Sequence, residues 1–141
     1  MEILDRLKSM VGVGKPTIAI GGIQSATGSV RGGEPLRGTV VLRGGEYDAP
    51  VQDVVLHLDE ERLVYPTPGR PERQFWRRIA AVEIAMGGRV LRKDEVLELP
   101  FELIVPVDLT PSDASVSYQL VAETEVPGLN PKAEQVVVVT A

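Results

Sequence analysis

The sequence predicts an all-β domain, a two-layer antiparallel sandwich preceded by one short amphipathic helix. Its 141 residues are enough for one domain with a hydrophobic core. The chain has 11 prolines, 14 glycines and only 4% aromatic residues, which favours many short strands joined by turns. Several segments alternate apolar and polar side chains, as strands with one buried face do. We therefore expect seven or eight strands in two packed sheets.

Residues 2–11 carry the pattern of the helix. Apolar side chains recur there at spacings of three and four, polar residues lie between them, and Gly12 and Gly14 follow as a stop. The apolar positions are Ile3, Leu4, Leu7, Met10 and Val11. A helix this short is marginal alone, so its apolar stripe is expected to pack on the domain or on a partner. The chain divides into residues 1–14, the helix with its glycine stop, and residues 15–141, the sandwich.

The first strands are expected around glycine-rich turns. Residues 15–23 form one strand, and residues 36–43 form another because β-branched side chains alternate there between the Gly33-Glu34-Pro35 turn and a Gly-Gly pair. Residues 51–65 are the longest candidate, in which leucines and valines alternate with polar residues up to an acidic interruption. Residues 66–72 contain three prolines and a glycine, and we expect a loop there.

Further strands are expected in the second half of the chain, at residues 74–86, 95–106, 115–125 and 134–140. Pro100 lies inside one of them. Because proline cannot donate to a ladder, Pro100 indicates an edge position, a bulge or a switch between sheets.

A series of short motifs carries a family resemblance. They are Val11-Gly12-Val13-Gly14, the Gly33-Glu34-Pro35 turn with its strand and Gly44-Gly45, the Pro100-Phe101, Pro106 and Pro111 segment, and a closing strand with Tyr118 before the terminal valines. In these motifs the chain resembles the bacterial sporulation-control protein family, whose members look like the amino-terminal half of arrestins, over residues 1 to about 140. The resemblance implies an arrestin-like, immunoglobulin-like sandwich in the cytoplasm, without catalytic residues, that binds other proteins in cell-state or sporulation control.

The chain departs from the family pattern in two places. Family members usually continue into a second β domain and an acidic tail, so we expect this chain to be a short relative or a fragment. The family also tends to have aspartates in the turn before the last strand, where residues 125–131 here read Glu-Val-Pro-Gly-Leu-Asn-Pro. No role of those aspartates is therefore carried over.

Composition argues against several classes of function. The net charge of −5 disfavours a domain that grips nucleic acid or anionic lipid. No stretch reaches the roughly 18 apolar residues of a membrane span, and the amino terminus does not read as a secretory signal. Because cysteine is absent, disulfides and thiolate metal sites are excluded, and the default location is cytoplasmic.

No catalytic site can be assembled from the reactive side chains. His57, the only histidine, is expected on the exposed face of its strand rather than as a ligand or a catalyst. Asp59, Glu60 and Glu61 read as a solvated turn, since a weak Ca²⁺ or Mg²⁺ site would need further oxygen ligands. We therefore expect no enzyme activity, no metal and no cofactor.

Arginines gather around the single tryptophan, after the longest strand. The residues are Arg62, Arg70, Arg73, Trp76, Arg77 and Arg78. The interpretation that we prefer from the sequence is that Trp76 lies in the core and the arginines solubilise a mobile loop. The alternative is a docking patch for an acidic protein segment, because arginine and tryptophan are enriched at binding hot spots.

The prediction is a non-enzymatic protein–protein interaction module, an adaptor or scaffold, in a cytoplasmic regulator that resembles sporulation-control proteins. The alternative is a structural immunoglobulin-like sandwich that acts in self-assembly or domain coupling. Because sandwich edges accept strands from other chains, residues 15–23 or 136–140, or the amino-terminal helix, are expected to support a homo-oligomer.

Overall fold

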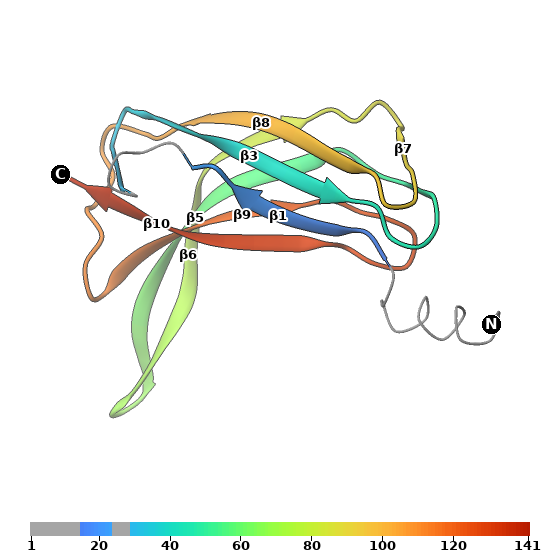
Figure 1. Ribbon diagram of the computed structural model, residues 1–141. Helices are drawn as coiled ribbons and strands as arrows, with labels where there is room; N and C mark the ends of the chain where they lie inside the picture. The colour runs from blue at the N-terminus through green and yellow to red at the C-terminus, as the bar shows by residue number, and fades with distance from the viewer. Residues whose placement is uncertain (1–14, 24–28) are drawn as a thin grey trace.

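The computed structural model describes residues 15–23 and 29–141. Within these ranges the chain forms ten β-strands and no helix (Figure 1). The strands are β1 (Thr17–Gly21), β2 (Ser29–Arg31), β3 (Pro35–Arg43), β4 (Ala49–Pro50), β5 (Val54–Thr67), β6 (Arg70–Ile84), β7 (Val90–Leu91), β8 (Val96–Ile104), β9 (Val116–Glu123) and β10 (Lys132–Thr140).

The strands pair into two main sheets and one small one. A three-stranded sheet has the order β1-β3-β8, and a five-stranded sheet has the order β2-β10-β9-β5-β6, while β4 and β7 pair by themselves. The two main sheets lie one over the other, and the far ends of β5 and β6 project away from both (Figure 1). This projection is the feature that positions the candidate site.

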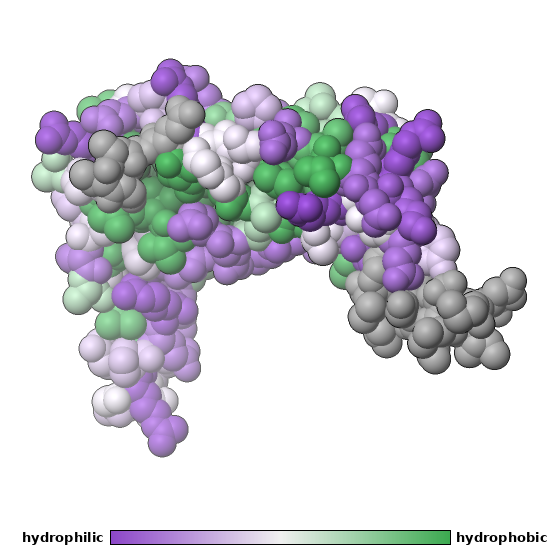
Figure 2. Space-filling model, in the orientation of Figure 1, coloured by the Kyte–Doolittle hydropathy of each residue, from purple (hydrophilic) through white to green (hydrophobic). Residues whose placement is uncertain are grey.

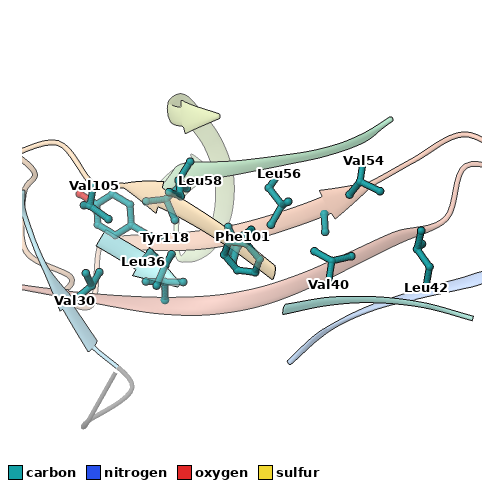
Figure 3. Close-up of a cluster of buried hydrophobic side chains, with 14 of the residues drawn as sticks. Val30, Leu36, Val40, Leu42, Val54, Leu56, Leu58, Phe101, Val105 and Tyr118 are labelled. Atoms are coloured by element: carbon teal, nitrogen blue, oxygen red, sulfur yellow. The ribbon is translucent and has the colours of Figure 1, made fainter. Parts of the chain in front are cut away.

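The hydrophobic core lies between the two main sheets. Along β3 the burial alternates, so that Leu36, Val40 and Leu42 point inward, as the period of a strand requires. They meet side chains from β5, β8 and β9, among them Leu56 and Tyr118 (Figure 3). Tyr118 is fully buried, and its hydroxyl donates a hydrogen bond of 2.6 Å to the carbonyl of Thr110, which satisfies the one polar atom of its side chain.

The predicted fold class needs correction. The sandwich is not purely antiparallel, because β10 pairs with β2 in parallel, with Val139 opposite Val30, so the five-stranded sheet is mixed. A strand of three residues such as β2 is too short to show alternation in the sequence. The predicted helix is not part of the described fold: no described residue is helical, and residues 2–11 lie outside the described ranges. What stands is an all-β fold compatible with a sandwich.

The expected loop at residues 66–72 is also wrong. β5 continues to Thr67 and β6 begins at Arg70, so only two residues form the turn. Gly69 has a φ of 76°, a left-handed conformation that glycine adopts at little cost. The prolines of this segment therefore belong to a hairpin and its tight turn.

The sheet order decides which strands are edges. β8 is an outer strand, which confirms an edge position for Pro100. β1 is an outer strand as expected, but β10 lies between β2 and β9, so the expectation of an edge at residues 136–140 is wrong. The outer strands of the five-stranded sheet are β2 and β6. The edge position of β6 was not predicted from the sequence.

Candidate protein-binding site on the projecting hairpin

The candidate site lies on the projecting end of the β5–β6 hairpin, residues 61–78, which we call the arm. β5 and β6 have 14 and 15 residues and are the longest strands among the described residues. β9 accompanies β5 only as far as Arg62, which pairs with Val116, so beyond this point the arm has two strands. Residues 65–78 are all exposed. Figure 2 shows the arm as a separate projection that is mostly hydrophilic towards its tip.

Three large aromatic side chains stand exposed on the arm. Tyr65 is 62% exposed, Phe75 is 60% exposed and Trp76 is 57% exposed. Scattered apolar side chains on a surface are ordinary, but three exposed aromatic side chains on one hairpin are an unusual concentration. The hypothesis that Trp76 lies in the core is therefore wrong.

Two β-bulges in β6 fix the base of the arm. Glu60 is opposite Arg77 and Glu61 is opposite Phe75, so Trp76 is an extra residue with no partner in the ladder. A second register shift leaves Ile79 as an extra residue in the same way. Because bulges increase the local twist and re-aim side chains, they set the direction in which Trp76 leaves the strand.

A buried carboxylate anchors the arm to the core. Glu60 has no solvent exposure. Its Oε2 accepts a hydrogen bond of 2.6 Å from Nε of Arg62, and its Oε1 accepts one of 3.1 Å from Nε of Arg77. A buried charge is costly unless it is paired and hydrogen-bonded, and both oxygens of Glu60 are paired. The guanidinium of Arg62 also lies 5.4 Å from the centre of the Trp76 ring, within the range of a cation–π contact.

A second polar cluster lies around His57. This residue is only 4% exposed. Its Nε2 lies 3.3 Å from Oε1 of Glu123 and 3.4 Å from Nη2 of Arg78. Nδ1 lies 2.9 Å from Oδ2 of Asp59, an ion-pair distance that lacks the alignment of a hydrogen bond. Nε of Arg78 donates to Oδ1 of Asp59 at 3.3 Å.

These positions correct two expectations. His57 is not on an exposed face, and Asp59, Glu60 and Glu61 are not a solvated turn but consecutive residues within β5. The reason is that β5 lies between β6 and β9, so its polar side chains are covered by neighbouring strands. The charges of Asp59 and Glu60 are paired with Arg78 and Arg77 of β6, which a single-strand pattern cannot show.

The arginines nearer the tip lack such compensation. Arg73 donates from Nη1 to Oγ of Ser117 at 2.9 Å and from Nη2 to the carbonyl of Ala114 at 3.3 Å, which ties the arm to the segment before β9. Within the described ranges, neither Arg70 nor Arg73 has a carboxylate at ion-pair distance. The arginines of the arm are therefore ion-paired at its base, whereas Arg70 and Arg73, with Glu72 between them in the sequence, form no ion pair with a described carboxylate towards its tip.

All the residues of the predicted binding patch lie on this hairpin, but in three groups. Arg62 and Arg77 pair with Glu60, and Trp76 lies beside Arg62. Arg78 belongs to the His57 cluster, and Arg70 and Arg73 lie further out along the hairpin. Sequence reasoning missed Glu60 as the organising residue and Tyr65 as an exposed ring. The signal for Glu60 was its place in the alternation of buried positions that includes Val54, Leu56 and Leu58.

Two further findings concern the described part of the chain. It contains no group of three or more histidines, cysteines or acidic residues arranged to hold a metal ion. None of its segments is a helix with the length and apolar character needed to cross a membrane.

Comparisons with known proteins agree with the family resemblance. The crystal structure of Spo0M, a sporulation control protein from Bacillus subtilis, matches with a TM-score of 0.77 and 18% sequence identity, covering 92% of this chain and 51% of the Bacillus chain. At this identity the match shows the fold, and the chain spans about half the length of the Bacillus protein. A comparison with curated proteins gave no match. A family model described as SpoOM protein matches residues 4–128, so the predicted resemblance is confirmed and the chain belongs to the SpoOM protein family.

Proposed function

We propose that this chain is a non-catalytic protein-binding module, an adaptor or scaffold, and that the arm contacts the partner. The observation that carries the proposal is the state of Trp76, which is 57% exposed and yet held through Arg62 to the buried Glu60. A large aromatic ring fixed at the surface is suited to binding, because little side-chain freedom remains to be lost when a partner docks.

The geometry of the arm supports the same role. It stands clear of the sandwich (Figure 1), so a partner can reach both of its faces. Tyrosine, tryptophan and arginine are the residues most enriched at interface hot spots, and the arm carries all three. The Glu60 ion pairs and the Arg73 hydrogen bonds fix a two-stranded hairpin that would be marginal alone.

The family supports a regulatory setting. The Bacillus relative is described as a sporulation control protein. We extend to this chain a role in the control of cell state, exerted through protein contacts in the cytoplasm. Because the chain spans about half of that relative, the role is proposed for this domain as a binding unit.

The absence of catalysis is part of the proposal. The only histidine is buried between Glu123, Arg78 and Asp59, so a substrate cannot reach its ring nitrogens without displacing them. An enzyme would need an accessible acid, base or nucleophile beside groups that stabilise developing charge.

A second role, in self-assembly, is favoured by one observation. β1 and β6 are outer strands of different sheets, and outer strands present unpaired backbone groups that another copy can extend. Assembly through these strands would not need Trp76, whereas the adaptor role would. A Trp76 variant therefore distinguishes the two roles.

The two roles can be tested by affinity capture from native lysate with two bait variants. Phe75→Ala/Trp76→Ala removes two exposed rings of the arm, and Val107→Ala, at a residue 84% exposed outside the arm, is the matched control. We expect one protein to be retained by the wild type and the control and lost by the arm variant. Retention by all three baits would contradict a role for the arm, and light scattering that shows a stable oligomer would favour self-assembly.

A further inference from the structure

We propose that the outward edges of Arg62 and Arg77 form a carboxylate-binding site, which takes an Asp or Glu side chain from an extended acidic segment of the partner protein. This inference rests on the proposed function and names the chemistry of the partner.

Each guanidinium has donors that Glu60 does not use. A guanidinium carries five N–H donors in a planar fork, with one edge at Nε and a second edge between the two Nη atoms. Arg62 and Arg77 each donate to Glu60 from Nε. Among the described residues, Glu60 is the only hydrogen-bond partner of either arginine. The Arg62 side chain is 33% exposed and that of Arg77 is 55% exposed, so both side chains reach solvent although Glu60 is buried.

The charge of the cluster favours a carboxylate over a phosphate. Two guanidinium groups lie at ion-pair distance from one described carboxylate, that of Glu60, and the charge of Asp113 also acts on Arg62. An Asp or Glu side chain adds one negative charge, whereas a phosphate group carries about −1.5 to −2 at neutral pH and would leave more excess negative charge. Because Glu60 is buried and fixed, an incoming carboxylate meets arginines that are already oriented.

Neighbouring residues indicate that the carboxylate arrives on an extended acidic peptide. The exposed ring of Trp76, beside Arg62, offers an apolar surface for a side chain next to the acidic one. Further along the arm, Arg70 and Arg73 outnumber Glu72 and form no ion pair with a described carboxylate. The whole chain has a net charge of −5, so this local reversal of sign attracts an acidic segment to the arm in particular.

Arg78 is not part of the site. Its Nε donates to Asp59, and its Nη2 lies against His57. Its charge and orientation are therefore committed to the His57 cluster. This separates the proposed site from a general basic patch, in which every arginine of the arm would contribute equally.

The first experiment selects peptides of random sequence on the immobilised wild-type domain, with removal of those that also bind Arg77→Lys. A lysine keeps a positive charge beside Glu60 but has no second planar edge for a partner carboxylate. We expect the selected peptides to be enriched in Asp and Glu next to apolar residues. Selected peptides without acidic enrichment, or an empty selection, would overturn the inference.

The second experiment measures affinity through the fluorescence of Trp76, the only tryptophan in the chain. The probe is the best selected peptide, compared with a copy in which Gln replaces each acidic residue. We expect the copy, and the Arg77→Lys protein with the original peptide, each to bind about tenfold more weakly, the loss of one charge-assisted contact. Arg43→Lys, an exposed arginine at the end of β3, should bind as the wild type does.

Thermal unfolding of each variant, followed by circular dichroism, checks that the fold is retained. Equal binding of the acidic peptide and its Gln copy, or wild-type affinity in a folded Arg77→Lys, would overturn the carboxylate site. Neither result would affect the proposed function, which is decided by the capture with Phe75→Ala/Trp76→Ala.

Discussion

The carboxylate of Glu60, which has no solvent exposure, accepts a hydrogen bond of 2.6 Å from Nε of Arg62. This pair connects the interior of the sandwich to its surface, because the same guanidinium lies 5.4 Å from the exposed ring of Trp76. A residue buried in the sandwich therefore holds the guanidinium that lies beside an exposed aromatic ring.

The Glu60→Gln variant should lower the free energy of unfolding by about 1–3 kcal/mol, because the hydrogen bonds lose their charge and a donating NH2 group replaces one of the two oxygens that accept from the arginines. The expected loss of unfolding free energy is smaller than the loss on breaking a fully buried ion pair, because the arginine side chains are partly exposed to water. Denaturant unfolding measures the change. The control is Glu102→Gln in the exposed Arg37 pair, expected to change stability by no more than about 1 kcal/mol. Equal losses would contradict the role of Glu60 as an anchor.

The Trp76→Ala variant should separate binding from stability. Because the ring is 57% exposed, its removal should cost no more than about 1 kcal/mol of unfolding free energy, whereas Phe101→Ala, at a residue 7% exposed in the core, should cost about 3–5 kcal/mol. Both values come from chemical denaturation. A large loss of stability in Trp76→Ala would mean that the ring serves the fold rather than a partner.

Features of the fold that depend on a local sequence pattern could be predicted, and features that depend on contacts between distant residues could not. β3 was predicted because Leu36, Val40 and Leu42 alternate along one strand, and a period of two is a local signal. The continuation of the hairpin through Thr67 was missed, since prolines that usually indicate a loop here flank a two-residue turn. The arginine-rich patch was found from composition. The burial of Glu60 agrees with the alternation along β5, but its pairing with Arg77 joins residues 17 apart on two strands, which no local signal shows.

The Gly38→Ala variant should destabilise the sandwich through a single added carbon. A Cβ at Gly38 would lie 2.8 Å from Cζ of Phe101, closer than packed atoms allow. We expect a loss of about 1–3 kcal/mol of unfolding free energy, the usual cost of overpacking a core. Gly21→Ala is the matched control, because its Cβ would meet nothing within 4 Å.

A double variant tests the stated cause. Phe101→Leu shortens the side chain that the new Cβ would strike, so it should recover part of the loss in the Gly38→Ala background while destabilising the wild type. Additive losses in the double variant would show that the contact between the two positions is not the reason.

The acid dependence of stability should include a contribution from Asp113. Hydrogen bonds from the Ser115 side chain, and then from the backbone N–H groups of Ser115 and Val116, lower the pKa of this carboxyl below 3.8. A carboxyl with a lowered folded-state pKa stabilises the fold above its unfolded value, and this contribution is lost as pH falls through the folded value. Ser115→Ala should therefore flatten the fall in unfolding free energy below about pH 4. An unchanged slope would contradict this assignment.

The alkaline dependence should be governed in part by Tyr118. Burial, and then the negative charge of Glu60, raise the pKa of this phenol above 10.0. The folded chain thus holds the phenolic proton more tightly than the unfolded chain does, so the contribution to stability is present below pH 10.0 and is lost as pH rises through the folded value. Tyr118→Phe should flatten this alkaline fall, at a cost of about 1 kcal/mol near neutral pH for the lost hydrogen bond to Thr110.

Titration of the tyrosinate absorbance gives a direct measurement of the same linkage. The wild type should show one phenol that ionises late, and this late phase should be missing from Tyr118→Phe. In Glu60→Gln the late phase should move to lower pH, because the neighbouring negative charge has been removed. A late phase that stays in place in Glu60→Gln would mean that burial alone holds the phenol neutral and that Glu60 does not influence the core through its charge.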